Sequence, residues 1–189
     1  MEVVTYPEDA VPASLRAQVV RLQEAAWPSG GVLDPAPWHD PLLRPRSVLL
    51  VDADARVVAA LDILSKGLVH RGQAFAASGI SAMVTDATLR GRGFGRQLAA
   101  AAWEIMAADG ADLGIFTCDR ELQRFYESAG WDCLAGSVLV GGSREAPFPS
   151  DQFDKVTMAS FFTGRARAAA PGFVGARIEL YPGDIDRLW

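Results

Sequence analysis

The sequence predicts a mixed α/β fold in which strands and helices do not alternate strictly. Strand-like and helix-like runs follow one another in the order β, α, β, β, β, loop, α, β, α, β, β. A doubly wound parallel sheet needs regular alternation of strand and helix, so this order excludes it. Half of the 189 residues are apolar and 22% are charged, which is typical of a globular chain with a sizeable core. We therefore expect one domain over residues 1–189.

The chain is expected to open with a strand and a helix. Residues 3–6, Val-Val-Thr-Tyr, favour a short strand. The next apolar residues recur at helical spacing and mark the buried face of a helix, at Leu15, Val19, Leu22 and Ala26. Residues 27–31, Trp-Pro-Ser-Gly-Gly, end this helix.

The stretch that follows, as far as Pro45, is rich in Pro and Gly and also carries Trp38, His39, Asp34 and Asp40. A long connection of this kind inside one domain is often functional. We interpret it as a functional loop or lid.

Two hairpins are expected next. Residues 48–51 and 57–64 are β-branched and apolar, and five turn-forming residues separate them. Arg71-Gly72 marks a second tight turn, and the strand after it continues to Thr85. His70 lies beside this turn and is expected at the surface.

Residues 90–95, Arg-Gly-Arg-Gly-Phe-Gly, are the candidate ligand-binding loop, which we call the glycine loop. Glycines let backbone N–H groups approach a ligand closely, because no Cβ intervenes. A helix begins directly after the loop, so its unpaired N–H groups and positive dipole end face the same place. This arrangement suits a phosphate. Cationic partners are available from Arg90, Arg92 and Arg96.

The spacing of the glycine loop excludes two common phosphate motifs. A dinucleotide fingerprint has glycines at its first, third and sixth positions, and a P-loop ends on Gly-Lys-Ser/Thr; neither pattern is present. The remaining alternative is a flexible Arg/Gly turn at the surface.

The second half continues with alternating helices and strands. Leu98, Ala102 and Ile105 mark the buried stripe of a helix, and residues 113–117 a buried strand. Asp119 is the expected N-cap of another helix, which carries Leu122, Phe125 and Ala129 on one face and Gly130 at its C′ position. Later strands are expected at residues 138–140, 156–158 and 178–181.

Composition and charge restrict the function and the location. The formal net charge of −5 argues against general nucleic-acid binding and suits a cationic substrate. No signal-peptide pattern opens the chain, and the longest apolar run is too short to span a bilayer. Cys118 and Cys133 show no metal-ligand spacing. We expect a cytoplasmic protein without a metal, in which both thiols are reduced core residues.

Two segments carry a resemblance to a known superfamily. The spacing Arg-x-x-Gly-x-Gly, between a strand and an Ala-rich helix, resembles the pyrophosphate loop of the GNAT acetyl-CoA-dependent N-acetyltransferases. Residues 122–131, with Tyr126 before Gly130-Trp131, resemble the helix segment of that superfamily. The likeness covers residues 3–161. Within the superfamily the chain is similar to aminoglycoside 2′-N-acetyltransferases, through these features, the His70-Arg71-Gly72 turn and a Gly-Asp…Trp ending.

The resemblance implies a fold and a cofactor site. It implies a twisted, mostly antiparallel sheet, flanked by helices, whose fourth and fifth strands splay apart to hold the pantetheine arm of acetyl-CoA. The arm would bond to the backbone of Met83, Val84 and Thr85, like an added strand. The pyrophosphate would lie at Arg90, Gly91, Arg92, Gly93, Phe94, Gly95 and Arg96. Related enzymes acetylate amines directly and are commonly dimers, so a homodimer is one assembly that the resemblance allows.

The resemblance also implies catalytic roles. A free backbone N–H near Val84 could stabilise the negative charge that develops on the carbonyl oxygen. Tyr126 matches the general acid that protonates the departing thiolate. The alternative role for Tyr126 is packing, as a half-buried aromatic residue beside Phe125.

The acceptor site departs from the subfamily. Ser81 stands where the subfamily has a Glu, and a serine hydroxyl is no base near neutral pH without an activating partner. Deprotonation of the amine would then pass through water, another acid or the terminal carboxylate. The expected substrate-binding residues are Asp34, Ser81, Ala82, Thr117, Asp151, Asp184, Asp186 and Trp189. Residues 163–189 would complete this site as a C-terminal tail, unless the tail is disordered.

Three functions remain open at this point. The first is acetylation of a primary amine on a small cationic, aminoglycoside-like substrate. The second is acetylation of another amine, on an amino acid, a polyamine or a peptide. The third is a non-catalytic acyl-CoA sensor, which the serine at position 81 suggests.

Overall fold

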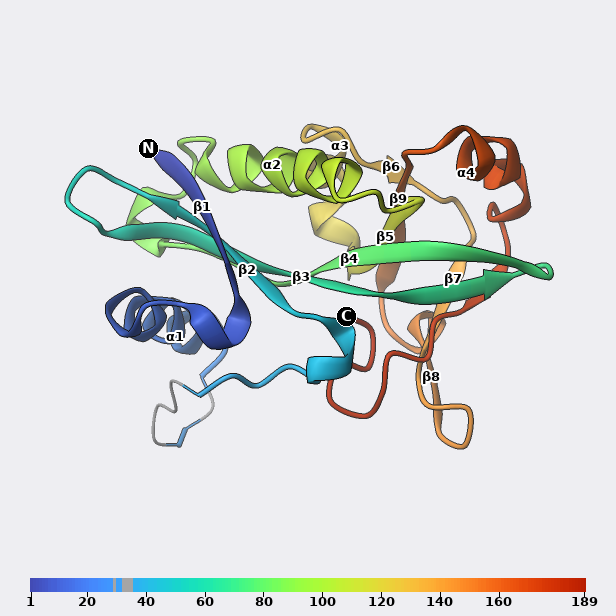
Figure 1. Ribbon diagram of the computed structural model, residues 1–189, viewed down its shortest axis with the longest axis horizontal. Coiled ribbons are helices and arrows are strands. Elements are labelled where there is room, and N and C mark those ends of the chain that lie inside the picture. Colours follow the sequence, from blue (N-terminus) through green and yellow to red (C-terminus); the bar gives the residue numbers. More distant parts are fainter. Residues whose placement is uncertain (29, 32–35) are drawn as a thin grey trace.

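The computed structural model describes residues 1–28, 30–31 and 36–189 (Figure 1). It contains a seven-stranded main sheet in the order β1-β2-β3-β4-β5-β9-β6 and a second sheet in the order β10-β7-β8. The strands are β1 Glu2–Pro7, β2 Arg46–Val51, β3 Val57–His70, β4 Gln73–Thr85, β5 Leu113–Asp119, β6 Asp132–Cys133, β7 Val138–Gly142, β8 Pro147–Pro149, β9 Lys155–Phe161 and β10 Arg177–Glu179. The α-helices are α1 Ala13–Ala26, α2 Phe94–Ala108, α3 Gln123–Glu127 and α4 Gly164–Ala169. Short 3₁₀ turns are η1 Glu8–Ala10, η2 Pro41–Leu43, η3 Ala87–Leu89, η4 Arg120–Leu122, η5 Ser150–Gln152 and η6 Ala170–Gly172.

The main sheet is mostly antiparallel and opens between β4 and β5. These two strands run parallel and pair only at Ala77–Leu113 and Ser78–Gly114 within the described residues. Beyond this point they diverge, whereas β3 stays paired with β4 as far as Thr85. The expected mixed α/β fold with a splay between the fourth and fifth strands is thereby confirmed.

Helices cover both faces of the sheet (Figure 1). On one face Leu98, Ala102 and Met106 of α2 pack into a cluster with Leu61 and Phe116. On the other face Val19 of α1 packs against the side chains of β2, β3 and β4, including Leu49 and Val84. Each strand between the helices is therefore buried on both sides, which explains why residues 57–64 form an almost continuous apolar run.

The second sheet was not apparent from the sequence. The late strands β7 and β9 are both present, but β9 joins the main sheet beside β5 and β7 pairs with β8 and β10. A third cluster, which includes Leu68, Leu139, Phe173 and Ile178, fills the space between this second sheet and the far end of the β3–β4 hairpin.

Two expectations about single residues were wrong. His70 is only 9% exposed, because the segment after α4 covers the hairpin turn: the His70 ring stacks on Phe173 at 4.2 Å, and its Nε2 lies 2.9 Å from the carbonyl oxygen of Gly172. Asp119 does not cap the helix that follows it, because its carboxylate accepts a hydrogen bond from Lys155 at 2.7 Å. The expected C′ glycine at position 130 does have a positive φ, of 95°.

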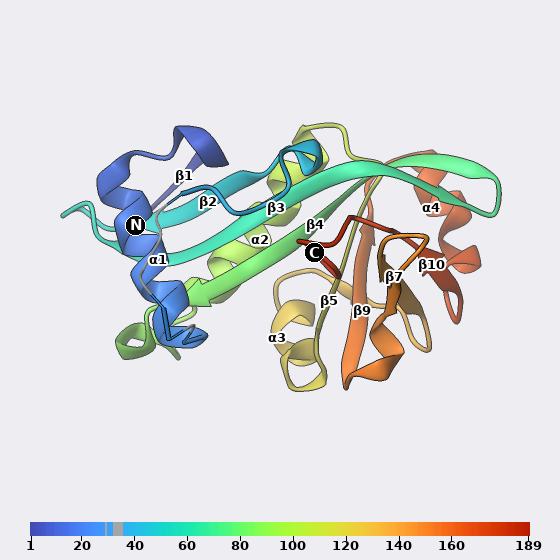
Figure 2. The same ribbon diagram turned by 90° about the horizontal axis from the view of Figure 1, so that it is seen from below.

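The chain ends in a docked segment, residues 180–189, which we call the terminal segment. The N–H of Gly142 donates to the carbonyl of Arg187 at 2.8 Å, and the N–H of Gly183 donates to the carbonyl of Gly142 at 3.1 Å. Leu188 is 9% exposed. Figure 2 shows the C-terminus beside β4 in the middle of the molecule. The alternative of a disordered tail is therefore wrong.

Candidate active site

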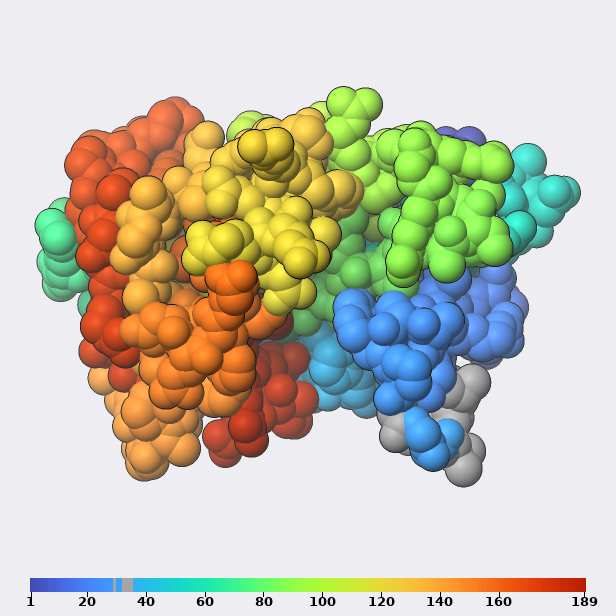
Figure 3. Space-filling view, turned by 180° about the vertical axis from the view of Figure 1, so that it is seen from behind, coloured from blue at the N-terminus to red at the C-terminus, as the bar shows by residue number. Residues whose placement is uncertain are grey.

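A groove opens where β4 and β5 diverge. It encloses about 610 Å³ and is bounded by the end of β4, the glycine loop, the first turn of α2, the helix α3 and the end of α1. Figure 3 shows it from behind as a hollow between α3 (yellow) and the start of α2 (green). The groove brings together most of the residues expected to bind the cofactor and the expected acid, namely Met83, Val84, Thr85, Arg90, Gly91, Gly93, Phe94, Gly95, Arg96 and Tyr126.

The glycine loop forms a cradle of backbone groups. Gly91 and Gly93 have φ angles of 77° and 83°, and a Cβ at either position would meet no atom within 4 Å. Gly95 has a different role, because a Cβ there would lie 2.9 Å from Oγ1 of Thr85 and would push α2 away from β4. The N–H groups in the first turn of α2 have no partner inside the helix. The residues present therefore fit a pyrophosphate at this place.

The start of the glycine loop is held by Asp86. Its carboxylate accepts hydrogen bonds from the backbone N–H of Thr88 at 2.9 Å and from the Thr88 hydroxyl at 2.7 Å. Arg56 forms an ion pair with it at 2.5 Å. The Thr88 hydroxyl contributes most to lowering the pKa of Asp86, burial opposes it, and Arg56 adds to it. The guanidinium of Arg90 makes only a long contact, 3.4 Å from Nε to the carbonyl of Thr85, so it is available to a ligand.

A β-bulge interrupts β4 beside the groove. Ala82 takes a left-handed conformation with a φ of 48°, and the register with β3 shifts so that Ala82 and Met83 together face Leu61. A non-glycine residue in this conformation is uncommon inside a strand and marks a functional position in many proteins.

The bulge decides which backbone groups face the splay. The N–H of Asp86 donates to the carbonyl of Val58 on β3 at 2.9 Å. Because N–H groups alternate in direction along a strand, Val84 also directs its N–H to β3, whereas Met83 and Thr85 direct theirs into the splay. The free N–H expected near Val84 is therefore the N–H of Met83.

Tyr126 lies at the same end of the groove. Its hydroxyl donates to the sulfur of Met83 at 3.4 Å, and its ring makes edge contacts with Phe116 and Phe125, with centroids 4.9 Å apart in both pairs. The residue is 6% exposed, and this burial raises the pKa of Tyr126. The phenol is therefore protonated near neutral pH, as a general acid must be.

The cysteines are poor nucleophiles. Burial raises the pKa of Cys118 to about 12, and burial also raises the pKa of Cys133. Cys118 is 5% exposed and belongs to the core on the α2 face, as expected. A thiolate at either position is disfavoured near neutral pH.

The opposite side of the splay is occupied by Trp189. A Cβ on Gly79 would lie 2.8 Å from Nε1 of the indole and 2.6 Å from the carbonyl oxygen of Ile115 on β5. Only a glycine therefore leaves room for the indole between the diverging strands. The indole N–H is buried and has no hydrogen-bond partner among the described residues.

A buried polar cluster lies behind this tryptophan. We call it the His39 cluster; its members are His39, Ser47, Asp62 and Asp186. Nδ1 of His39 is 2.5 Å from Oδ1 of Asp186, and Nε2 is 3.3 Å from Oδ2 of Asp62. The Ser47 hydroxyl donates to Asp62 at 2.6 Å. Asp62 is directly opposite Ser81 in the ladder, so the serine also belongs to this face.

The electrostatics of the cluster favour a charged imidazole. Burial by itself would lower the pKa of His39, but the hydrogen bond to Asp186 and the nearby carboxylate of Asp62 outweigh it and raise the pKa to about 9. His39 is therefore an imidazolium near neutral pH and cannot serve as the base that deprotonates an amine.

The remaining candidates for substrate binding are scattered. Thr117 is half-buried on β5, directly opposite Thr157 of β9. Asp151 forms an ion pair with Arg177 at 2.9 Å, beside the second sheet. Asp184 is exposed on the terminal segment, whereas Asp186 is buried in the His39 cluster. Asp34 lies outside the described residues.

Several residues of the site were not recognised in the sequence. Trp27, Leu122 and Phe125 line the groove, and the role of Asp62 as a partner of His39 was missed. Asp62 did leave a signal, because it is a carboxylate in the middle of an apolar strand, and such a group needs a buried partner.

Comparisons with known proteins identify the family to which this site belongs. The family described as "Acetyltransferase (GNAT) domain" matches residues 10–134. A search of curated protein sequences returns no significant match. No helix in the described ranges is long and apolar enough to cross a membrane.

Solved structures with the same fold cover most of the chain. Escherichia coli ElaA is 20% identical, with a TM-score of 0.57 over 84% of this chain and 99% of that one. An acyl-CoA N-acyltransferase from Pseudomonas aeruginosa is 15% identical, with a TM-score of 0.57 over 84% and 97%. An aminoglycoside 6′-N-acetyltransferase complexed with coenzyme A is 14% identical, with a TM-score of 0.59 over 87% and 99%. The family match spans well over half of the chain, which therefore belongs to the GNAT acetyltransferases.

Proposed function

We propose that the protein transfers the acetyl group of acetyl-CoA directly to a primary amine on a small cationic, aminoglycoside-like acceptor. The observation that carries this proposal is the groove in which the glycine cradle, the free edge of β4 and the Tyr126 hydroxyl meet. The negative net charge and the carboxylates of the terminal segment favour a cationic acceptor.

In the proposed complex the chain binds coenzyme A almost entirely through its backbone. The glycine loop and the first turn of α2 hold the pyrophosphate, with Arg90, Arg92 and Arg96 as cationic partners. The backbone of Met83 to Thr85 pairs with the pantetheine arm. Acetyl-CoA supplies the thioester carbonyl that the amine attacks. Met83 N–H would then donate to the oxygen of that carbonyl as negative charge develops.

Tyr126 and Trp189 take the two proton transfers in this scheme. The Tyr126 hydroxyl gives its proton to the departing sulfur, at the position where it now donates to Met83. The base is drawn from the acceptor side. Ser81 has no activating partner within the described part of the chain, and His39 is already protonated, so we assign the base to the terminal carboxylate of Trp189, acting directly or through water.

The proposal treats residues 1–189 as one catalytic domain, with residues 163–189 as the tail that completes the acceptor site. Support comes from the docking of the terminal segment and from the position of the Trp189 indole beside Gly79. An indole offers a flat wall for a sugar or an ammonium group.

The test is release of coenzyme A in the presence of an amine panel. The panel contains kanamycin-like aminoglycosides, polyamines, free amino acids and short peptides, and mass spectrometry identifies the acetylated product. Turnover on aminoglycosides at the highest kcat/KM is the expected result. A preference for peptides or amino acids would show that the proposed acceptor is wrong, while acetyl transfer to an amine would still be supported.

A second function, a non-catalytic acyl-CoA sensor, is favoured by one observation, the serine at position 81 in place of a carboxylate. If calorimetry shows binding of acetyl-CoA but no member of the amine panel is acetylated, the sensor function would be favoured over the enzymatic one.

A further inference from the structure

The His39 cluster joins three segments that are distant in the sequence. His39 comes from the Pro-rich loop, Asp62 from the middle of β3, and Asp186 from the terminal segment. His39 and Asp186 are 147 residues apart along the chain. Their exposures are 3% and 4%, and that of Asp62 is 2%. Nδ1 of His39 is hydrogen-bonded to Asp186 and Nε2 forms a longer ion pair with Asp62, so a positively charged imidazolium suits both carboxylates.

Further contacts complete the cluster. The N–H of Asp40 donates to the second oxygen of Asp186 at 3.0 Å. The Trp38 ring stacks on His39 with centroids 3.9 Å apart. The Asp186 carboxylate is thus held by one side chain and one backbone group of the same loop.

The cluster fixes the position of the last residues of the terminal segment. Asp186 lies three residues before Trp189, and the N–H of Trp189 donates to the carbonyl of Asp186 at 3.3 Å. The backbone between them is bonded to β7, through the contact of Arg187 with Gly142. Movement of Asp186 would therefore move the indole that fills the splay beside Gly79.

We propose that His39 is a positioning residue: paired with Asp186 and Asp62, it latches the terminal segment so that Trp189 stands at the acceptor end of the splay, and loss of its positive charge releases the segment. The contacts of His39 with Asp186 and Asp62 support the latch without reference to any activity. The role of Trp189 in acceptor binding rests on the proposed function.

The latch depends on pH with a defined sign. Burial lowers the pKa of His39, but Asp186 and Asp62 raise it by more, so the pKa rises from 6.5 to about 9. Other charged groups near it are Glu8 on η1, whose pKa is raised chiefly by burial, and Arg16 on α1, which pairs with Glu8. A raised pKa in the folded state means that the stabilisation is complete below the ordinary histidine value and is lost as the pH rises through about 9.

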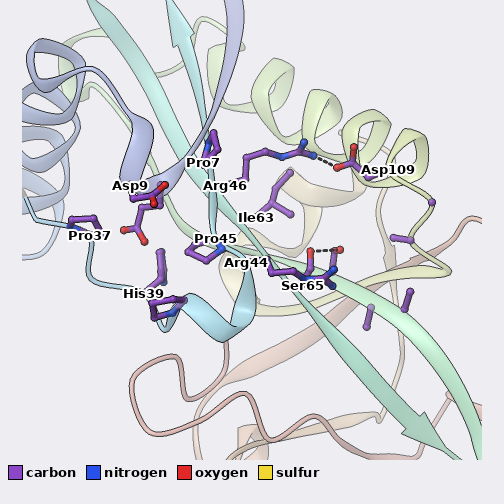
Figure 4. Close-up of a pocket in the computed structure, with 17 residues that line it drawn as sticks. Pro7, Asp9, Pro37, His39, Arg44, Pro45, Arg46, Ile63, Ser65 and Asp109 are labelled. Carbon is purple, nitrogen blue, oxygen red and sulfur yellow. Dashed lines mark hydrogen bonds and ion pairs between the residues drawn. The ribbon is translucent and has the colours of Figure 1, made fainter.

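His39 lies beside a second cavity of the molecule. This cavity, of about 680 Å³, is lined by His39 together with residues of η1, the Pro-rich loop, β3 and the end of α2. Figure 4 shows His39 at the wall of this cavity, with Pro37 and Asp9. The His39 side chain is itself 0% exposed, so the ring lies beside this cavity and not in it.

The direct test is hydrogen exchange of the terminal segment, which needs no substrate. The reporters are the amides of Gly142 and Gly183, whose partners are Arg187 and Gly142. Removing one partner of a buried ion pair is strongly destabilising, so His39→Ala and Asp186→Asn should each speed exchange there by about a hundred-fold. Asp184→Asn is the matched control, because it makes the same change on an exposed position of the same segment.

Two further measurements separate a latch from general packing. His39→Asn keeps a neutral donor near Nδ1, so it should recover part of the protection and remove its dependence on pH. In the wild type, exchange corrected for its intrinsic pH dependence should accelerate between about pH 8 and pH 10. His70→Asn alters the other histidine of the chain and should leave the reporters protected.

The outcomes are distinguishable. Unchanged exchange in both His39→Ala and Asp186→Asn, or exchange in the wild type that shows no alkaline step, overturns the latch. Coenzyme A binding, measured by calorimetry, should stay the same in all variants. If the variants exchange faster but the wild-type protein acetylates no amine of the panel, the latch is supported and the proposed function is wrong. Faster exchange with an unchanged KM for amine overturns the positioning role of Trp189.

Discussion

The two sides of the splay between β4 and β5 are built from opposite kinds of interaction. The proposed cofactor side is built mainly from residues 83–96, a continuous stretch of the chain, and presents backbone N–H groups in an open groove. The acceptor side consists of the terminal segment and the His39 cluster, which are far apart in the sequence and are held by buried charges. The first side offers unpaired groups to a ligand, whereas the second has already paired most of its own.

This difference has consequences for mutation. Groups on the cofactor side are free, so their replacement should change ligand binding more than stability. Groups on the acceptor side are paired with one another, so their replacement should first change the position of the chain and only then the binding of a ligand. Four predictions test this contrast, in order of decreasing expected effect.

Tyr126→Phe should lower kcat by roughly a hundred-fold, the range for loss of general-acid help, with little change in coenzyme A affinity. The replacement keeps the ring contacts with Phe116 and Phe125 and removes only the hydroxyl that donates to Met83. Steady-state kinetics and thermal unfolding are measured together. A loss of stability large enough to account for the whole loss of activity would assign Tyr126 to packing.

Gly93→Val should weaken coenzyme A binding by about ten-fold or more, equivalent to 1.4 kcal/mol per decade, because its side chain would enter the phosphate cradle. Gly110→Val is the matched control: Gly110 has a φ of 80°, close to the 83° of Gly93, and both have open space at Cβ. Both variants carry the same backbone strain, at opposite ends of α2. Equal affinities in calorimetry would show that the cradle does not hold the pyrophosphate.

Deletion of Leu188 and Trp189 should raise the KM for amine by roughly five-fold, since a cation over a partly buried indole contributes about 1 kcal/mol. The affinity for acetyl-CoA should not change, because no residue of the terminal segment lines the groove proposed to hold the cofactor. A tag fused directly to Trp189 removes the free carboxylate and should lower kcat as well. Unchanged amine kinetics in both proteins would exclude the terminal segment from the acceptor site.

The smallest effect is expected for a pair of exposed tryptophans. Trp27 is 54% exposed and lines the cofactor groove, and Trp38 is 46% exposed and stacks on His39. Trp27→Ala should weaken coenzyme A binding by about two-fold, as expected for loss of partly exposed apolar contact. Trp38→Ala should leave that affinity intact and instead speed exchange of the terminal segment. Faster exchange in Trp27→Ala together with weaker coenzyme A binding in Trp38→Ala would contradict the proposed difference between the cofactor side and the acceptor side.

Much of the cofactor side could be predicted from the sequence because its information is local. Glycine permits conformations with positive φ wherever it occurs, and a helix start always has unpaired N–H groups, so the order strand, glycine loop, helix already indicates an anion site. Gly91 and Gly93 take these conformations in the structure. Tyr126 could be placed by its position in a short motif.

The acceptor side depended on tertiary structure. On the cofactor side too, a β-bulge at Ala82 changed the phase of β4, so the N–H groups of Met83 and Thr85 face the splay and that of Val84 faces β3; such a one-residue shift has no signature in the hydrophobic pattern. The division of β7 and β9 between two sheets likewise follows from contacts made late in the chain.

The sequence by itself determined the mixed α/β order and the position of the glycine loop between a strand and a helix. Only the tertiary structure decided that the Asp62 carboxylate in an apolar strand and the Asp186 carboxylate near the C-terminus share one imidazole. The physical reason is that a buried charge must find a partner, but its partner is selected by which segments fold over it and not by its neighbours in the chain.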